Sequence, residues 1–203
     1  MSNTTSLVAA PLLRELQAIL ERQSIRRGDF TLTSGAKSKY YCDTKATVLS
    51  PSGAALVGRA LHALLAPHRP EAVGGLAMGA AYLATAVAIA SVETDLPIPG
   101  FVVRAEAKGH GTLSRIDQAW HAGGPLITAG RKVAVVDDVV TTAGSTLRAI
   151  DAVVEAGCEV VAVAAVLDRQ AGGAERIRDR GLPFAALFRA DSEGELHLDA
   201  TWS

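Results

Sequence analysis

Two adjacent carboxylates, Asp137 and Asp138, stand between an apolar run and a stretch of small, mostly hydroxyl-bearing residues. A phosphate group binds well to hydroxyl groups, to backbone N–H groups that can approach closely and to the positive end of a helix dipole. The stretch can supply all three and consists of Thr141, Thr142, Ala143, Gly144, Ser145 and Thr146. Carboxylates repel phosphate, so the aspartates are expected to meet sugar hydroxyls or a hydrated magnesium ion. The sequence therefore predicts a site for a phosphorylated sugar.

The same stretch argues against two common nucleotide-binding classes. It lacks the lysine of a Walker loop and the three-glycine spacing of a dinucleotide-binding turn, which disfavours an NTPase or a dehydrogenase. A blander alternative is that Asp137 and Asp138 only cap the following loop.

The surrounding pattern predicts an α/β fold, in which a parallel sheet is flanked by helices and carries the acidic pair at a strand end. Helices are expected over 12–21, 52–65, 80–91 and 145–155, and strands over 72–76, 99–103, 132–136, 159–167 and 184–188. Residues 28–48 are expected to form a hairpin or loop hood beside the sheet, and residues 105–124 a long loop. No internal boundary is evident, so residues 1–203 are expected to form one domain, with a small N-terminal hood from about 20–48.

Composition restricts the partners. Twenty basic and twenty-one acidic side chains give a net charge of -1, which argues against non-specific nucleic-acid binding. Cys42 and Cys158 have no metal-site or disulfide-framework spacing and favour a reduced, cytoplasmic protein. Residues 72–92 carry no charge and could span a bilayer by length, but alanine and glycine dominate them, so no membrane segment is expected.

Residues 135–146 resemble the phosphoribosyl pyrophosphate (PRPP) signature of the type I phosphoribosyltransferases. The resemblance implies that fold, Mg²⁺ as cofactor, and PRPP binding by Asp137, Asp138, Val139, Val140, Thr141, Thr142, Ala143, Gly144, Ser145 and Thr146. No direct protein ligand to the metal is expected, since PRPP and water would hold it. Ala143 stands where many members have glycine, which is tolerable if its φ stays negative.

Residues 30–45, FTLTSGAKSKYYCDTK, resemble the hood of the orotate phosphoribosyltransferases. Paired aromatics can cover a flat pyrimidine, and the Asp-Arg segment at 168–169 resembles the family segment whose arginine holds orotate. The likeness implies orotate binding by Ser34, Gly35, Tyr40, Tyr41, Lys45, Thr141 and Arg169. A hairpin with exposed tyrosines and a surface arginine are the structural alternatives.

Residues 104–111, RAEAKGHG, resemble the family's mobile catalytic loop. The likeness implies that Arg104, Lys108 and His110 act in catalysis together with Asp137 and Asp138, closing over the pyrophosphate. It also implies a homodimer that shares residues 104–124 across its interface. Three positions that are often lysine are Ala105, Thr33 and Gly79 here, which leaves catalytic strength open.

The implied reaction is that of a glycosyltransferase of pyrimidine biosynthesis, in which orotate and PRPP give orotidine 5′-phosphate and pyrophosphate. Two alternatives stay open: a purine phosphoribosyltransferase, and a non-catalytic regulatory protein that keeps the sugar-phosphate pocket.

Overall fold

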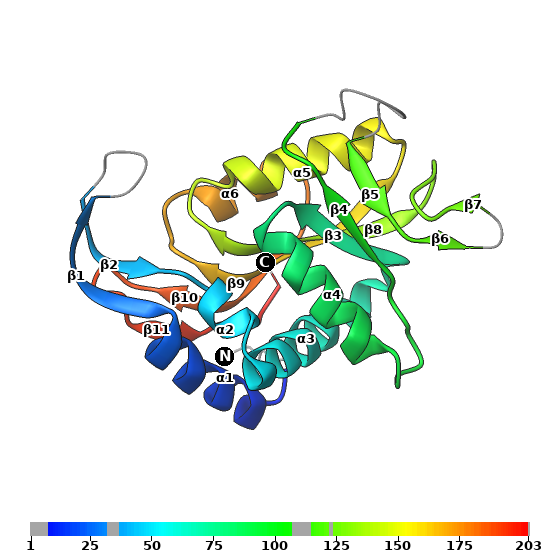
Figure 1. Cartoon of the computed structure of the whole chain (residues 1–203). Helices are drawn as coiled ribbons and strands as arrows, with labels where there is room; N and C mark the ends of the chain where they lie inside the picture. Colours follow the sequence, from blue (N-terminus) through cyan, green and yellow to red (C-terminus); the bar gives the residue numbers. More distant parts are fainter. Residues whose placement is uncertain (1–7, 32–36, 107–114, 122–123, 203) are drawn as a thin grey trace, which may run out of the picture.

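The computed structural model describes residues 8–31, 37–106, 115–121 and 124–202. A seven-stranded sheet forms its centre (Figure 1). The strands run in the order β11 (Leu196–Leu198), β10 (Phe184–Ala190), β9 (Glu159–Asp168), β8 (Lys132–Val140), β3 (Ala72–Leu76), β4 (Gly100–Val103) and β5 (Ile116–Gln118). Two further pairs lie outside this sheet: β1 (Ile25–Thr31) with β2 (Lys37–Cys42), and β6 (Trp120–His121) with β7 (Gly124–Pro125).

The five central strands are parallel, as the sequence predicted, and both edge strands are antiparallel. All five predicted strands are present. The prediction that residues 105–124 form only a loop is wrong at 116–118, where β5 pairs with β4, and at 120–121 and 124, where β6 pairs with β7. Such short strands carry too few residues for a recognisable alternation.

Helices cover both faces of the sheet (Figure 1). One face is covered by α3 (Pro51–Leu65) and α4 (Gly79–Ser91), with α1 (Ala10–Gln23) packed beside α3; a 3₁₀ turn, Ala66–His68, follows α3. The other face is covered by α5 (Gly144–Glu155) and α6 (Gly173–Arg178). Strand β8 is apolar on both sides because Val133 and Val135 pack toward α5, whereas Ala134 and Val136 pack toward the α3 side.

The hood consists of the β1–β2 hairpin and a short helix, α2 (Lys45–Val48), that the sequence pattern did not indicate. Figure 1 shows the hairpin (blue) standing at one end of the main sheet, where α1 also lies. This arrangement agrees with the expected hairpin beside the main sheet.

The uncharged stretch 72–92 divides into β3 and the 13-residue helix α4. Within the part of the chain that the structure describes, no helix combines the length and apolar character that a bilayer crossing requires.

Candidate active site

Asp137 lies in the last part of β8 and organises the turn that follows it. Its side chain is buried, and its Oδ2 accepts hydrogen bonds from Ser145 Oγ at 2.7 Å and Thr146 Oγ1 at 2.6 Å. Its Oδ1 accepts a third from the backbone N–H of Asp138 at 3.0 Å. Burial raises the pKa of Asp137 to about 6, and the two hydroxyl donors oppose that rise. Asp137 therefore anchors the start of α5 to the end of β8.

The hydroxyls of Ser145 and Thr146 thus point inward, toward Asp137, and not toward an open socket. The turn still offers donors, because α5 has no side-chain cap and the first N–H groups of a helix lack intrahelical partners. Thr141 and Thr142 precede this helix; Thr142 is exposed, and neither hydroxyl bonds to another described residue. Backbone amides and these two threonines are therefore the available anion ligands.

Ala143 adopts a left-handed conformation, with φ 59° and ψ 20°. The condition under which alanine was expected to be tolerable here, a negative φ, is not met. The chain reverses sharply here to pass from β8 into α5, and this turn requires the conformation that glycine adopts most easily. For alanine it costs roughly 1–2 kcal/mol.

Asp138 lies where three segments meet. Its Oδ2 accepts a hydrogen bond from Thr44 Oγ1 at 2.6 Å, and Thr44 is fully buried between β2 and α2. On the other side, a Cβ atom at Gly79 would lie 2.5 Å from Asp138 Oδ1. Any side chain at position 79 would therefore require the Asp138 carboxylate to shift. Sequence reasoning missed Thr44, although it lies within the run that resembles the hood.

Arg169 follows β9 and turns toward the hood hairpin. Its backbone N–H donates to Val140 O at 2.9 Å, which ties it to the end of β8. Its side chain donates from Nε to Tyr40 Oη and from Nη2 to Ser38 Oγ, both at 2.9 Å. The structure thus brings Arg169 and Tyr40 together and adds Ser38, which the sequence analysis did not select.

The two tyrosines of the hood differ. Tyr40 is 3% exposed, whereas Tyr41 is 40% exposed and its ring lies 5.9 Å from that of Phe30. Lys45, at the start of α2, forms an ion pair with Asp43 at 2.5 Å. Only Tyr41 offers an open aromatic surface of the kind that the sequence predicted for both.

Arg104 follows β4 and pairs through two hydrogen bonds with Asp117 on β5. It lies at the base of the predicted catalytic loop. The other predicted loop cations, Lys108 and His110, and the hood residues Thr33, Ser34 and Gly35 lie outside the described residues.

No metal cage is visible in the described ranges: no group of three or more His, Cys, Asp or Glu side chains is arranged to hold an ion. Asp137 already accepts three hydrogen bonds from the protein. The donor set fits a hydrated ion carried by a substrate better than one bound directly by side chains.

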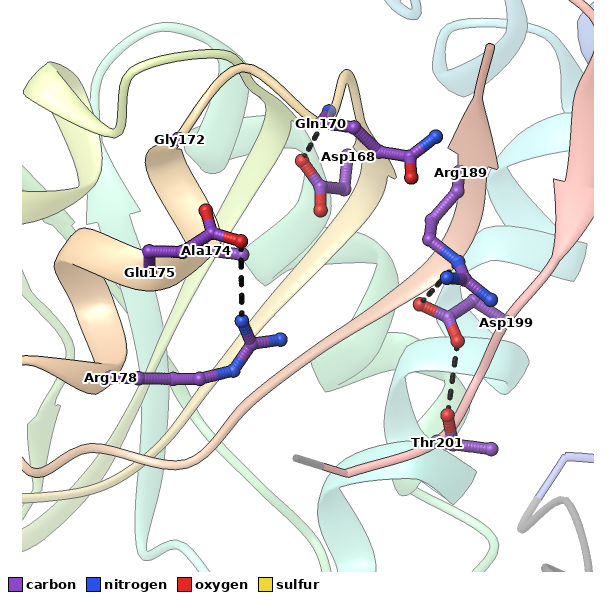
Figure 2. Close-up of a pocket in the computed structure, with 9 residues that line it drawn as sticks. All are labelled: Asp168, Gln170, Gly172, Ala174, Glu175, Arg178, Arg189, Asp199 and Thr201. Atoms are coloured by element: carbon purple, nitrogen blue, oxygen red, sulfur yellow. Dashed lines mark hydrogen bonds and ion pairs between the residues drawn. The ribbon is translucent and has the colours of Figure 1, made fainter.

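A cavity of about 530 Å³ lies on the α6 side of β9 and β10 (Figure 2). None of the predicted site residues lines it. Its charged groups are largely paired with one another, Arg178 with Glu175 at 3.8 Å and Arg189 with Asp199 at 3.3 Å. Asp168 faces this cavity and accepts the backbone N–H of Gln170 at 2.8 Å, which fixes the turn that carries Arg169.

Comparison with known proteins decides the family. The model of the phosphoribosyl transferase domain matches residues 52–182. Orotate phosphoribosyltransferase from Thermosynechococcus vestitus is 44% identical over 192 residues, which cover 95% of this chain and 97% of that protein. The Aquifex aeolicus orotate phosphoribosyltransferase is 40% identical over 178 residues, 86% of this chain and 93% of that one. The chain belongs to the orotate phosphoribosyltransferase family.

Solved structures agree with this family. Orotate phosphoribosyltransferase of Mycobacterium tuberculosis in complex with PRPP has a TM-score of 0.71 and 36% identity, covering 87% of this chain and 94% of that one. Adenine phosphoribosyltransferase from Saccharomyces cerevisiae has a TM-score of 0.61 at 18% identity, covering 83% of this chain and 95% of that one. The second likeness shows a shared fold alone and gives no support to a purine acceptor.

Proposed function

We propose that this member of the orotate phosphoribosyltransferase family transfers the phosphoribosyl group of PRPP to orotate in pyrimidine biosynthesis, forming orotidine 5′-phosphate and pyrophosphate. One observation carries the proposal. The buried carboxylate of Asp137 shapes an uncapped helix start beside Asp138, and the same strand end is bonded to Arg169. The groups that we assign to the phosphate, to the ribose hydroxyls and to the orotate carboxylate thus lie at one edge of the sheet.

The sugar-phosphate half is assigned to the turn after β8. The amides of residues 144–146 and the hydroxyls of Thr141 and Thr142 would receive the 5′-phosphate, aided by the helix dipole. Asp138 would accept the ribose hydroxyls, while Asp137 holds the turn in place. Val140 contributes through its backbone, since its side chain is buried.

The acceptor half is assigned to Arg169 and the hood. A guanidinium group can bind a carboxylate with two parallel hydrogen bonds. Arg169 would bind orotate in this way, with Tyr41 against the pyrimidine and Lys45 and Thr141 at its edge. Ser34 and Gly35 keep the roles that the family likeness implies.

The chemistry is displacement at the anomeric carbon of the sugar by a ring nitrogen of orotate, as pyrophosphate leaves. Positive charge develops on the sugar and negative charge on the leaving group, so positioning and electrostatics supply most of the rate. Magnesium, held by PRPP and water, would neutralise part of the pyrophosphate charge. Arg104, Lys108 and His110 would approach the leaving group, and Arg104 would exchange its pairing with Asp117 for the pyrophosphate.

We further propose a homodimer that shares residues 104–124 across its interface. Ile89 and Val92, at the end of α4, are 71% and 73% exposed, which is unusual for large apolar side chains and supports association of this face. Sedimentation of the purified chain tests the dimer, and a monomer at assay concentration would exclude the shared loop. The two unpaired cysteines agree with a reducing, cytoplasmic location.

The activity is tested by mixing the chain with magnesium, PRPP and orotate and following orotate absorbance. Loss of absorbance that requires PRPP and magnesium is expected, and adenine, guanine or xanthine should not compete. Lys108→Ala should lower kcat far more than it raises KM, because its contact forms as the bond breaks. Lys132→Ala, at the exposed opposite end of β8, is the matched control. PRPP binding without turnover would instead favour a regulatory protein.

A further inference from the structure

Tyr40 is placed to hold Arg169 and not to cover a substrate. The Arg169 Cζ atom lies 4.4 Å from the centre of the Tyr40 ring, and its Nε donates to the Tyr40 hydroxyl at 2.9 Å. The same tyrosine therefore contacts the guanidinium through both its π-face and its oxygen.

The Tyr40 ring also contacts the turn between β10 and β11. A Cβ atom at Gly194 would lie 2.5 Å from Tyr40 Cγ, so the backbone of the turn between β10 and β11 packs directly against the ring. Gly194 has φ 80°, and its carbonyl accepts a hydrogen bond from Arg27 Nη2 at 3.4 Å. Tyr40 is held by contacts with both this turn and Arg169, and 3% of it is exposed.

Ser38 completes the support. Its hydroxyl accepts from Arg169 Nη2 at 2.9 Å and donates to the backbone oxygen of Tyr40 at 2.7 Å. Nε and Nη2 form one edge of the planar guanidinium, and this edge is bonded to the hairpin. The outer edge, made by Nη1 and the second Nη2 hydrogen, has no partner among the described residues.

The turn beneath the arginine is fixed as well. The backbone N–H of Arg169 donates to Val140 O. The next residue, Gln170, donates its backbone N–H to Asp168 and its Nε2 to Ala190 O, the latter at 3.0 Å. The side chain is therefore fixed at its base by the sheet and at its tip by the hairpin. An arginine loses substantial rotamer freedom when it binds, so this arrangement removes most of that cost in advance.

We propose that Tyr40 and Ser38 are positioning residues that hold the Arg169 guanidinium so that only its outer edge meets the acceptor. That edge matches a planar carboxylate, so the pair helps to select an acceptor base that carries one. The inference rests on the proposed orotate transfer and adds to it residues that act through Arg169 and need not touch the substrate.

Tyr40→Phe tests the hydroxyl while keeping the buried ring. The KM for orotate is expected to rise about 10- to 150-fold, as for loss of one hydrogen bond to a charged group. The KM for PRPP and kcat should stay within about twofold, because the β8 turn is untouched. Ser38→Ala should act in the same direction. Tyr82→Phe, on α4, removes a phenol hydroxyl outside the hood and is the matched control.

A double-mutant cycle separates positioning from direct contact. With Arg169→Lys already present, Tyr40→Phe should change kcat/KM for orotate by less than about twofold, because there is no guanidinium left to orient. If Tyr40→Phe instead lowers kcat/KM for orotate by the same factor in the Arg169→Lys background as in the wild type, Tyr40 contacts orotate independently of Arg169. That result would overturn the inference. An unchanged orotate KM in Tyr40→Phe would overturn it too. A wild-type chain without orotate turnover would refute the proposed function itself, which is a distinguishable result.

Discussion

The buried carboxylate of Asp137 should give the protein a measurable dependence of stability on pH. Burial raises its pKa from an ordinary value of 3.8 to about 6, so the folded chain binds this proton more tightly than the unfolded chain does. Between these two values the folded state carries more protons, and stability from this group must fall as pH rises. The rise of this pKa from 3.8 to about 6 corresponds to about 3 kcal/mol.

Asp137→Asn keeps the shape of the side chain and removes its titration. We expect the free energy of unfolding of the wild type, minus that of Asp137→Asn, to be about 3 kcal/mol larger below pH 4 than above pH 6. Urea unfolding of both proteins at a series of pH values measures this difference, and the titration of all other groups largely cancels. An NMR titration of the Asp137 carboxyl gives its pKa directly.

A difference that stays constant from pH 3.5 to 7 would refute the reasoning, since it would mean that the folded carboxyl titrates as in the unfolded chain. The activity should depend on pH in the opposite direction to the stability. The ionised carboxylate accepts both Ser145 and Thr146, so kcat/KM for PRPP should decline as pH falls through about 6.

Substitutions at three further positions, two of them with a comparison variant, test the turn and its neighbours. Gly79→Ala places a Cβ atom 2.5 Å from Asp138 Oδ1 and should lower kcat/KM for PRPP by about tenfold or more; an unchanged value would show that Asp138 can shift freely. Ala143→Val should destabilise the fold by about 2 kcal/mol or more, since a branched side chain resists φ 59°, while Ala143→Gly should stay within about 1 kcal/mol; equal melting temperatures for both variants would contradict this. Thr44→Val removes the donor to Asp138 and should raise KM for PRPP several-fold, whereas Thr85→Val on α4 should not; matching effects would argue against a specific role of Thr44.

The sequence predicted the central architecture because each inner strand is a nearly continuous apolar run. It placed the end of β8 too early, at residue 136, because the two aspartates break that run. The strand continues to Val140 because β9 pairs with it as far as Asp168. Pairing between strands thus overrides local polarity.

The candidate site was predicted in part. Local motifs indicated the residues after β8 and the arginine after β9, since strand ends share one edge of a parallel sheet. Local motifs could not indicate to which oxygen the hydroxyls of Ser145 and Thr146 donate. Their inward orientation, toward Asp137, was therefore not predicted. The left-handed backbone of Ala143 and the contact of Thr44 with Asp138 depend on tertiary packing and leave no trace in residue spacing.

The β1–β2 hairpin forms its own two-stranded sheet and shares no ladder with the seven-stranded one. The turn that we propose to bind the 5′-phosphate, by contrast, follows β8, a strand that is paired on both sides. The proposed acceptor half rests partly on this hairpin, through Tyr40 and Ser38, and Thr44, which follows the hairpin, links the hood to Asp138. Exchange of the β1–β2 hairpin should therefore change the contacts to Arg169, while β8 keeps the strand pairing that supports the turn after it.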